Sequence, residues 1–336
     1  MTVFYEVMQA TLRVAVPLMI VALGGLFSER SGVTNIALEG LMLFGGFFGI
    51  WAVQFVERNT AWDMMLWGIR WDRQAIYLIA MLVGALTGGA FAMLHGYASV
   101  YMKSDQIISA TALNLLAVSF VVFVARTTQT HPDGRPTGGS QVGYTSRFII
   151  REFPGLGRIP FIGDIFFRQM YLGLIVGILI LTATIIIMYR TRIGLRLRAC
   201  GENPHAADSL GINIYRYRFF AVAVSGMLAG IGGVFYTIST STEYAPTVEG
   251  LGFLAIAVLI FGNWKPHMVA LAAVFFALMR VLGQYYLNIP FLRDLGIPAT
   301  FFRMTPYVAT LVVLAIFSKT SRAPKALGQI YDQGKR

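Results

Sequence analysis

Long apolar runs separated by short polar segments dominate the chain. About 20 helical residues cross the roughly 30 Å hydrocarbon core of a bilayer, so each run of this length predicts a membrane-spanning helix. Nine spans are predicted, at residues 8–27, 35–55, 75–95, 106–125, 170–189, 217–238, 248–264, 267–287 and 304–318. The predicted fold class is an all-α, polytopic membrane helical bundle of about eight to ten transmembrane helices, forming one domain over residues 1–336.

Two segments need separate treatment. Residues 290–303, "PFLRDLGIPATFFR", are too interrupted to span and predict a re-entrant or interfacial piece. The N-terminal run has no basic region and no small-residue cleavage site before residue 27, so it predicts a retained span and not a signal peptide.

Lysine and arginine positions predict the orientation. The 190–218 loop carries six arginines, and the 319–336 tail is also basic. Four predicted spans separate these segments, so both lie on one side, and the positive-inside rule makes that side cytoplasmic. The net charge of +11 is then a topology and lipid-headgroup signal, and no nucleic-acid partner is expected.

The 126–169 segment carries six arginines as well, yet the span count makes it a long extracytoplasmic loop. Long loops follow the charge rule less strictly, so this placement stands. The odd number of spans puts the N-terminus on the same external side.

Composition agrees with a membrane protein: 13% of residues are charged, against roughly 25% in soluble domains. The single cysteine, Cys200, excludes an intramolecular disulfide, and the four histidines are too scattered to predict a metal site. Pairs of glycines four residues apart predict close helix packing, at 45 and 49, 84 and 88, 173 and 177, and 226 and 230.

The polar stretch 198–218 predicts a short helix at about 204–210. Asn203 is a favourable N-cap, Pro204 suits the first turn, and Gly211 ends the helix. Its small apolar contacts are Ala206, Ala207 and Leu210. A helix this short is unstable alone, so it must dock on its own protein or in a groove of a soluble partner.

Three separated motifs resemble one family. They are "GENPHAADSLGI" followed by "SGMLAGIGGVFY", then "ERSGVTNIALEGLMLFGGFFG" at 29–49, and "MTPYVATLVVLAIFSK" leading into "APKALGQIYDQGKR". Together they are similar to permease subunits of ATP-binding-cassette (ABC) importers, in the group serving branched-chain amino acids, ribose-type sugars and nucleosides. The second and third motifs resemble its nucleoside and simple-sugar branch.

The resemblance implies a type II importer-like bundle whose short cytoplasmic helix sits in a groove of an ATPase subunit. The motif residues implied for this coupling are Gly201, Glu202, Asn203, Pro204, Ala206, Ala207 and Gly211, beside Leu210 from the helix pattern. The implied partners are an ABC ATPase, a second identical or related permease subunit and an extracytoplasmic solute-binding lipoprotein. The implied location is the bacterial inner, or cytoplasmic, membrane.

The sequence contains no G-x-x-x-x-G-K-[ST] motif, the loop that cradles ATP phosphates. ATP and Mg are therefore expected on the partner ATPase, with no cofactor in this chain. The chain is expected to form the pore and not to be an enzyme.

Polar groups within spans are expensive and indicate functional positions. The candidate translocation path consists of Asn35, Glu39, Thr111, Asn114 and Glu249. The alternative for the asparagines is hydrogen bonding between helices, and for Glu39 a structural acid. Arg13 and Arg280 are expected to snorkel or to pair near span ends.

The predicted cargo is a nucleoside, with purine nucleosides first, and the alternatives are simple sugars or branched-chain amino acids. A secondary transporter would need ionisable groups along the spans, and acidic residues there are nearly limited to Glu39. A membrane-embedded enzyme would need a convergent catalytic cluster, and the sequence indicates none.

Overall fold

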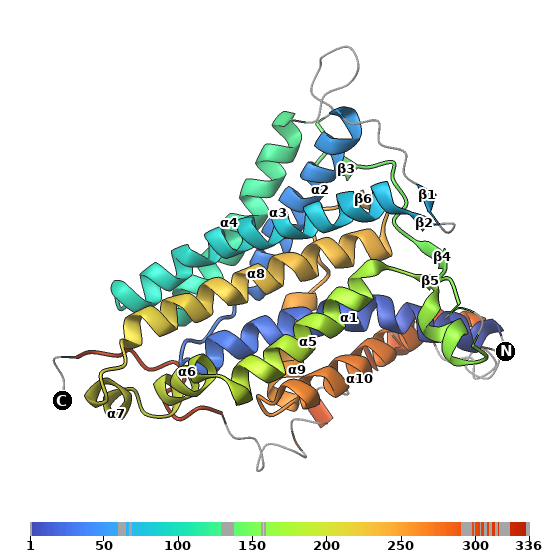
Figure 1. Cartoon of the computed structure of the whole chain (residues 1–336). Coiled ribbons are helices and arrows are strands. Elements are labelled where there is room, and N and C mark those ends of the chain that lie inside the picture. Colours follow the sequence, from blue (N-terminus) through green and yellow to red (C-terminus); the bar gives the residue numbers. More distant parts are fainter. Residues whose placement is uncertain are drawn as a thin grey trace.

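The computed structural model describes residues 2–59, 65–66, 69–128, 138–155, 157, 159–289 and 323–333, with isolated positions between 298 and 315. Over these residues the chain is a bundle of long helices (Figure 1). Seven helices in the described part are long and apolar enough to span a membrane. They are α1 (Thr2–Arg30), α2 (Leu38–Asn59), α3 (Trp71–Gly96), α4 (Gln106–Thr128), α5 (Leu172–Arg190), α8 (Ile214–Thr240) and α10 (Pro266–Tyr285).

The remaining elements are short. Three helices are α6 (Arg192–Glu202), α7 (Pro204–Ser209) and α9 (Leu251–Phe261). Three antiparallel strand pairs join β1 (Met65–Leu66) to β2 (Ile69–Arg70), β3 (Val142–Gly143) to β6 (Glu243–Tyr244), and β4 (Ile150–Glu152) to β5 (Arg168–Met170). Single turns of other helix types cover Tyr97–Tyr101, Gly163–Phe167 and Tyr286–Asn288.

The bundle has two distinct ends. The segment 138–170 and β6 form one end, here called the loop end, and α6, α7 and the tail residues 323–333 form the α7 end (Figure 1). Helix α1 starts at the loop end, where the Gln9 side chain donates to the Asp164 carbonyl at 2.7 Å. It finishes at the α7 end, where Arg30 lies 3.8 Å from Glu202. The tail therefore shares an end with the 190–218 loop, and the N-terminus shares an end with the 126–169 loop, as predicted.

The predicted span at 248–264 is wrong as a full helix. Helix α9 has 11 residues and, at 1.5 Å per residue, is about 16 Å long, roughly half a bilayer core. The chain still passes from the loop end, where β6 pairs with β3, to the α7 end, where Trp264 meets Arg30. The non-helical residues 245–250, between β6 and α9, supply the rest of the crossing. The apolar run itself begins at Leu251 and ends at Gly262, and the predicted span was too long because it included the turns on either side, at Glu249 and Gly250 and at Asn263 and Trp264.

The other described spans match their predicted positions within a few residues. The predicted span at 304–318 and the re-entrant piece at 290–303 lie largely outside the described residues.

Helices α2, α3 and α8 meet backbone to backbone through the predicted glycines. A Cβ atom on Gly230 would lie 2.0 Å from the Gly84 carbonyl oxygen, and one on Gly45 would lie 2.4 Å from Gly230 Cα. On the same faces, a Cβ on Gly88 would lie 2.5 Å from the Gly226 oxygen. The predicted close packing is confirmed at these positions.

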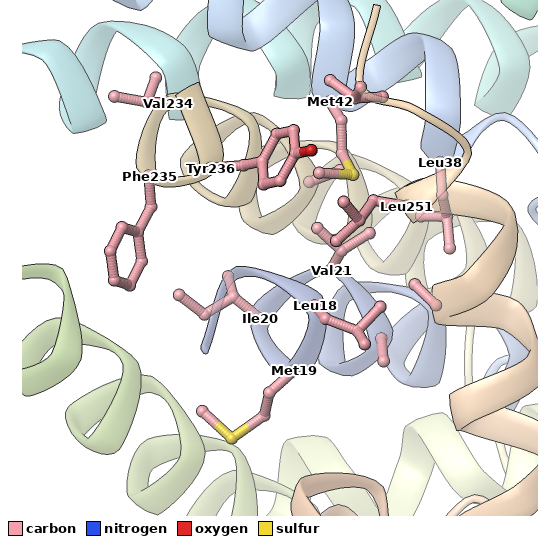
Figure 2. Packing of buried hydrophobic residues seen from close by; sticks show 14 of the residues in the cluster. Leu18, Met19, Ile20, Val21, Leu38, Met42, Val234, Phe235, Tyr236 and Leu251 are labelled. Carbon is pink, nitrogen blue, oxygen red and sulfur yellow. The ribbon is translucent and has the colours of Figure 1, made fainter. Parts of the chain in front are cut away.

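Apolar side chains fill the space between these helices and α1 and α9. Figure 2 shows Leu18 and Val21 of α1 facing Leu251 of α9, with Met42 of α2 above them. All four side chains are buried. Helix α1 therefore runs through the middle of the fold, and its ends position the surfaces described below.

The glycine contacts generate a stability prediction. Gly230→Ala should lower the free energy of unfolding by at least the ~1–3 kcal/mol typical of overpacking, because the added methyl meets a backbone oxygen that no rotamer change can move. The measurement is the thermal unfolding midpoint in detergent. Gly143→Ala is the matched control, since nothing lies within 4 Å of its added Cβ. Equal midpoints for the two variants would contradict the contact.

Candidate functional site

The α6–α7 corner is built by local capping. Thr191 caps α6 by accepting from the Gly194 amide at 3.2 Å. Asn203 caps α7 by accepting from the Ala206 amide at 3.1 Å, and Pro204 occupies the first turn, as predicted. Helix α7 ends at Ser209, one residue before the predicted end, and Gly211 follows with φ +78°. The glycine permits the left-handed turn that redirects the chain toward α8.

The two faces of α7 have different environments. Ala207 is 2% exposed and packs with Cys200, Ile214 and Tyr331, and Pro204 is buried beside it. Ala206 is exposed and Leu210 is 82% exposed. Residues three or four apart share one side of a helix, so 204 and 207 face inward while 206 and 210 face outward.

The Ala207 side chain faces the chain's own residues, so its part in the coupling stays a prediction, in which it acts by supporting α7. Its methyl group packs against the chain's own residues and supports α7 from beneath. The outward surface consists of Ala206, Ser209, Leu210 and Gly211, and the exposed His205 lies at its edge, beside the ring of Tyr331.

Gly201 and Glu202 attach the corner to the transmembrane bundle. A Cβ on Gly201 would lie 2.3 Å from the Arg30 carbonyl oxygen, so only glycine allows this approach. Arg30 faces Glu202 at 3.8 Å and also donates through Nη2 to the Trp264 carbonyl at 2.8 Å. Trp264 in turn donates its indole N–H to Glu29 at 2.6 Å. The end of α1 thus joins α6 to the turn between α9 and α10.

Arg218 is a residue of this region whose role the sequence did not reveal. In the sequence it counts as one of the six loop arginines that indicate the cytoplasmic side, but its side chain is only 3% exposed. Its Nε donates to the Ser31 carbonyl at 3.2 Å and its Nη1 to the Gln329 carbonyl at 2.9 Å. One guanidinium therefore joins α8, the α1–α2 link and the tail. The local signal was weak, since charged residues are common where a helix begins.

Two predicted path residues, Asn35 and Asn114, hold the non-helical backbone at the start of α2. Asn35 donates to Ser225 Oγ at 2.9 Å and accepts from the Ala37 amide at 3.1 Å. Asn114 of α4 donates to the Ile36 carbonyl at 3.0 Å and accepts from the Gly40 amide at 2.8 Å. The asparagines thus bridge separate helices, which is the contact expected under the alternative interpretation.

Glu39 of α2 caps the short helix α9. Its two carboxylate oxygens accept from the Gly250 amide at 2.9 Å and the Gly252 amide at 2.7 Å, at the N-terminus of α9. A helix N-terminus has unpaired amides and a positive dipole, so a carboxylate is the favourable partner. Thr111 does not join this group: it is exposed, and its hydroxyl bonds to the Ile107 carbonyl of its own helix.

A second polar group lies beside the same break. Tyr236 of α8 donates to the Glu249 carboxylate at 3.1 Å, and Arg280 of α10 forms an ion pair with that carboxylate. Arg280 is therefore paired, as expected. The Glu249 side chain is 57% exposed, whereas that of Arg280 is 14% exposed. The arrangement presents a hydrogen-bonding surface where α9 begins. Among the described residues no cluster of three or more potential metal ligands is found.

Comparison with known proteins gives a consistent result. The family model described as branched-chain amino acid transport system, permease component, matches residues 7–317. The chain is 37% identical to the nucleoside ABC transporter permease protein NupC of Lactococcus lactis, covering 95% of this chain and 94% of that protein. It is 36% identical to the guanosine ABC transporter permease protein NupQ of Bacillus subtilis, covering 98% and 97%.

A more distant relative is a putative glucose ABC transporter permease protein of Haloferax volcanii, 29% identical over 97% of each chain. The resemblance seen in the three sequence motifs is confirmed by these full-length matches. The chain, a multi-pass membrane protein, belongs to the family of branched-chain amino acid transport system permease components and is a transport subunit, not an enzyme.

Proposed function

We propose that this chain is the pore-forming subunit of an ABC importer that carries nucleosides, driven by ATP hydrolysis on a separate subunit. The observation that carries the proposal is the outward face of α7, with Leu210 82% exposed on a helix whose opposite face is fixed to the bundle. A large apolar side chain at such a position favours a partner groove. The names of the two relatives at 37% and 36% identity support the cargo.

The described contacts provide a route for transmitting force. Pressure on α7 would reach α6 directly, and α6 contacts Arg30 through Gly201 and Glu202. Arg30 holds the Trp264 carbonyl, in the turn that joins α9 to α10. Movement of a bound ATPase against α7 would therefore be passed on to the short helix α9. Asn203 and Gly211 fix the geometry of the helix that receives the force.

The proposed path passes the break at α9. Glu249, Tyr236 and Arg280 together offer donors and acceptors of the kind that bind the hydroxyls of a ribose. Glu39, Asn35 and Asn114 shape this region by holding its backbone, and Thr111 is an outlying candidate. The Haloferax relative keeps simple sugars as the second candidate cargo, with branched-chain amino acids third.

The proposed assembly contains an ABC ATPase that binds ATP and Mg, a second permease subunit, and an extracytoplasmic solute-binding lipoprotein in the bacterial cytoplasmic membrane. In this arrangement the α7 end faces the cytoplasm and the loop end faces outward. The basic 190–218 loop favours this orientation.

Replacing the outward residue should uncouple the complex. Leu210→Asp should abolish most substrate-stimulated ATPase activity and uptake, because a carboxylate in an apolar groove loses its hydration without gaining a partner. Its thermal midpoint should equal that of the wild type, since the side chain is exposed. Leu210→Met is the conservative control and should retain coupling.

Ala207→Asp tests the inward face of α7, which supports the helix, separately from the outward face that is proposed to dock on the ATPase. The buried site would take up an unpaired charge, so this variant should lose stability by several kcal/mol and insert poorly. Wild-type coupling in an assembled Leu210→Asp complex would exclude α7 as the docking element.

The energy source distinguishes the importer from a secondary transporter. Uptake of a purine nucleoside into proteoliposomes containing the complete complex should require ATP on the α7 side and should persist when a protonophore collapses the proton gradient. Uptake that continues without ATP and disappears with the protonophore would overturn the proposed function and favour the alternative.

Substitutions at the helix break should distinguish a path role from a packing role. Glu39→Leu leaves the amides of Gly250 and Gly252 without an acceptor, at about 1–3 kcal/mol for each buried group, so its thermal midpoint should fall. Glu39→Gln retains one oxygen and should lose less. Uptake of two nucleosides and one sugar, normalised to inserted protein, is then measured for Glu39→Leu and for Asn114→Leu. A path residue should change the selectivity among these cargoes, whereas a packing residue should lower stability and leave selectivity unchanged. An unchanged midpoint for Glu39→Leu would contradict the capping role.

A further inference from the structure

The tail residues 323–333 are held between two other segments at the α7 end. The Ala326 amide donates to the Gly201 carbonyl at 2.9 Å, and the Gly328 amide donates to the Gly32 carbonyl at 3.1 Å. The tail is therefore hydrogen bonded on one side to the α6–α7 corner and on the other to the link between α1 and α2. Gly328 has φ +76°, a turn that glycine adopts without strain.

Tyr331 anchors the tail beneath α7. It is 5% exposed and packs in the cluster with Cys200, Ala207 and Ile214. Its ring centroid lies 5.3 Å from that of His205 and 5.5 Å from that of Tyr215. The inward face of α7 thus rests in part on a tail residue more than 120 positions away in the sequence.

Two cations secure the rest of the tail. Arg218 donates to the carbonyls of Gln329 and Ser31, which lie on different segments. Lys103, in the link between α3 and α4, forms a 2.8 Å ion pair with Asp332. The Asp332 carboxylate raises the pKa of Lys103, so the lysine stays charged.

We propose that the tail residues 323–333 are a transmission element, which carries displacement of α7 to the link between α1 and α2, with Tyr331 and Arg218 as positioning residues. The proposal rests on the proposed function, because it assumes that a partner moves α7. It adds a second route to the one through Arg30 and Trp264.

The second route is continuous. Tyr331 contacts α7, and Arg218 joins the tail to Ser31. The same link contains Asn35, bonded to Ser225 of α8, and leads into Glu39, which caps α9. Each step is a hydrogen bond, a buried packing contact or the continuous chain from Ser31 to Glu39, so the tail and the break of α9 are connected without a gap.

Cys200 reports directly on whether the tail is docked. It is the chain's single cysteine and lies beneath Tyr331 and Ala207. Burial raises the pKa of its thiol to about 11. Alkylating reagents attack the thiolate, so the docked tail should protect Cys200, and undocking should expose it.

The experiment uses the assembled complex with its ATPase and binding protein. Tyr331→Ala should speed alkylation of Cys200 by a maleimide about tenfold or more, because local opening limits the reaction of a buried group. It should also lower substrate-stimulated ATPase toward the basal rate and reduce nucleoside imported per ATP hydrolysed. Tyr331→Phe keeps the ring and should restore both. Ile330→Ala, at an exposed neighbouring position, is the matched control.

A second, milder variant keeps the proposal testable if the Tyr331→Ala complex assembles poorly. Lys103→Glu places a like charge opposite Asp332 at an exposed site, and it should shift both readouts in the same direction by a smaller factor.

The outcomes are distinguishable. Faster alkylation with unchanged import per ATP would show that the tail only shields Cys200 and does not transmit movement. This result would overturn the proposal. Unchanged alkylation in both Tyr331→Ala and Lys103→Glu would show that these contacts do not hold the tail, which also overturns it. If Leu210→Asp likewise leaves coupling intact, α7 is not the docking element, and the assumption that a partner moves α7 fails. If only Leu210→Asp uncouples, the proposed function stands without the tail.

Discussion

A backbone that leaves helical geometry inside hydrocarbon must still pair its amides and carbonyls, because no water is available there. This chain breaks its helices in the link before α2 and in the stretch before α9. Glu39 accepts from two amides at the start of α9, and Asn114 pairs with both a carbonyl and an amide around the start of α2. The polar side chains in the spans are thus requirements of the broken fold, and the proposed path lies where they gather.

The α7 end combines rigid local structure with contacts between distant segments. Capping by Asn203 and the turn at Gly211 give α7 a fixed shape, while its inward face rests on Cys200, Ile214 and Tyr331. Gly201 lets the corner approach the end of α1 closely. A helix of six residues could not hold its position without these contacts, since isolated short helices are unstable. The outward face is therefore presented by the whole end of the bundle.

The sequence could predict what depends on neighbouring residues. Apolar runs located the spans, and Asn203, Pro204 and Gly211 located α7, because these signals are local. The short length of α9 matches the apolar run 251–262, and the predicted span was too long because it also took in Glu249 and Gly250, which turn the backbone. Which face of α7 points inward depends on Tyr331, which arrives from the far end of the chain. Arg218 looked like any loop arginine, because its acceptors at Ser31 and Gln329 are distant in sequence.

The glycine contacts among α2, α3 and α8 determine which parts of the bundle can move. A Cβ atom would not fit between Gly45, Gly84 and Gly230, so these three helix backbones are already at their closest approach. Sliding one past another would force backbone atoms together, and close-packed interfaces of this kind shift as units. The three helices should therefore move together as one rigid unit. Helix α9 is held just as closely, because a Cβ atom on Gly252 would lie 2.3 Å from the Glu39 amide nitrogen of α2. Helix α10 reaches α8 through the side chains of Arg280 and Tyr236, so alternating access would come from α10 moving against the other helices.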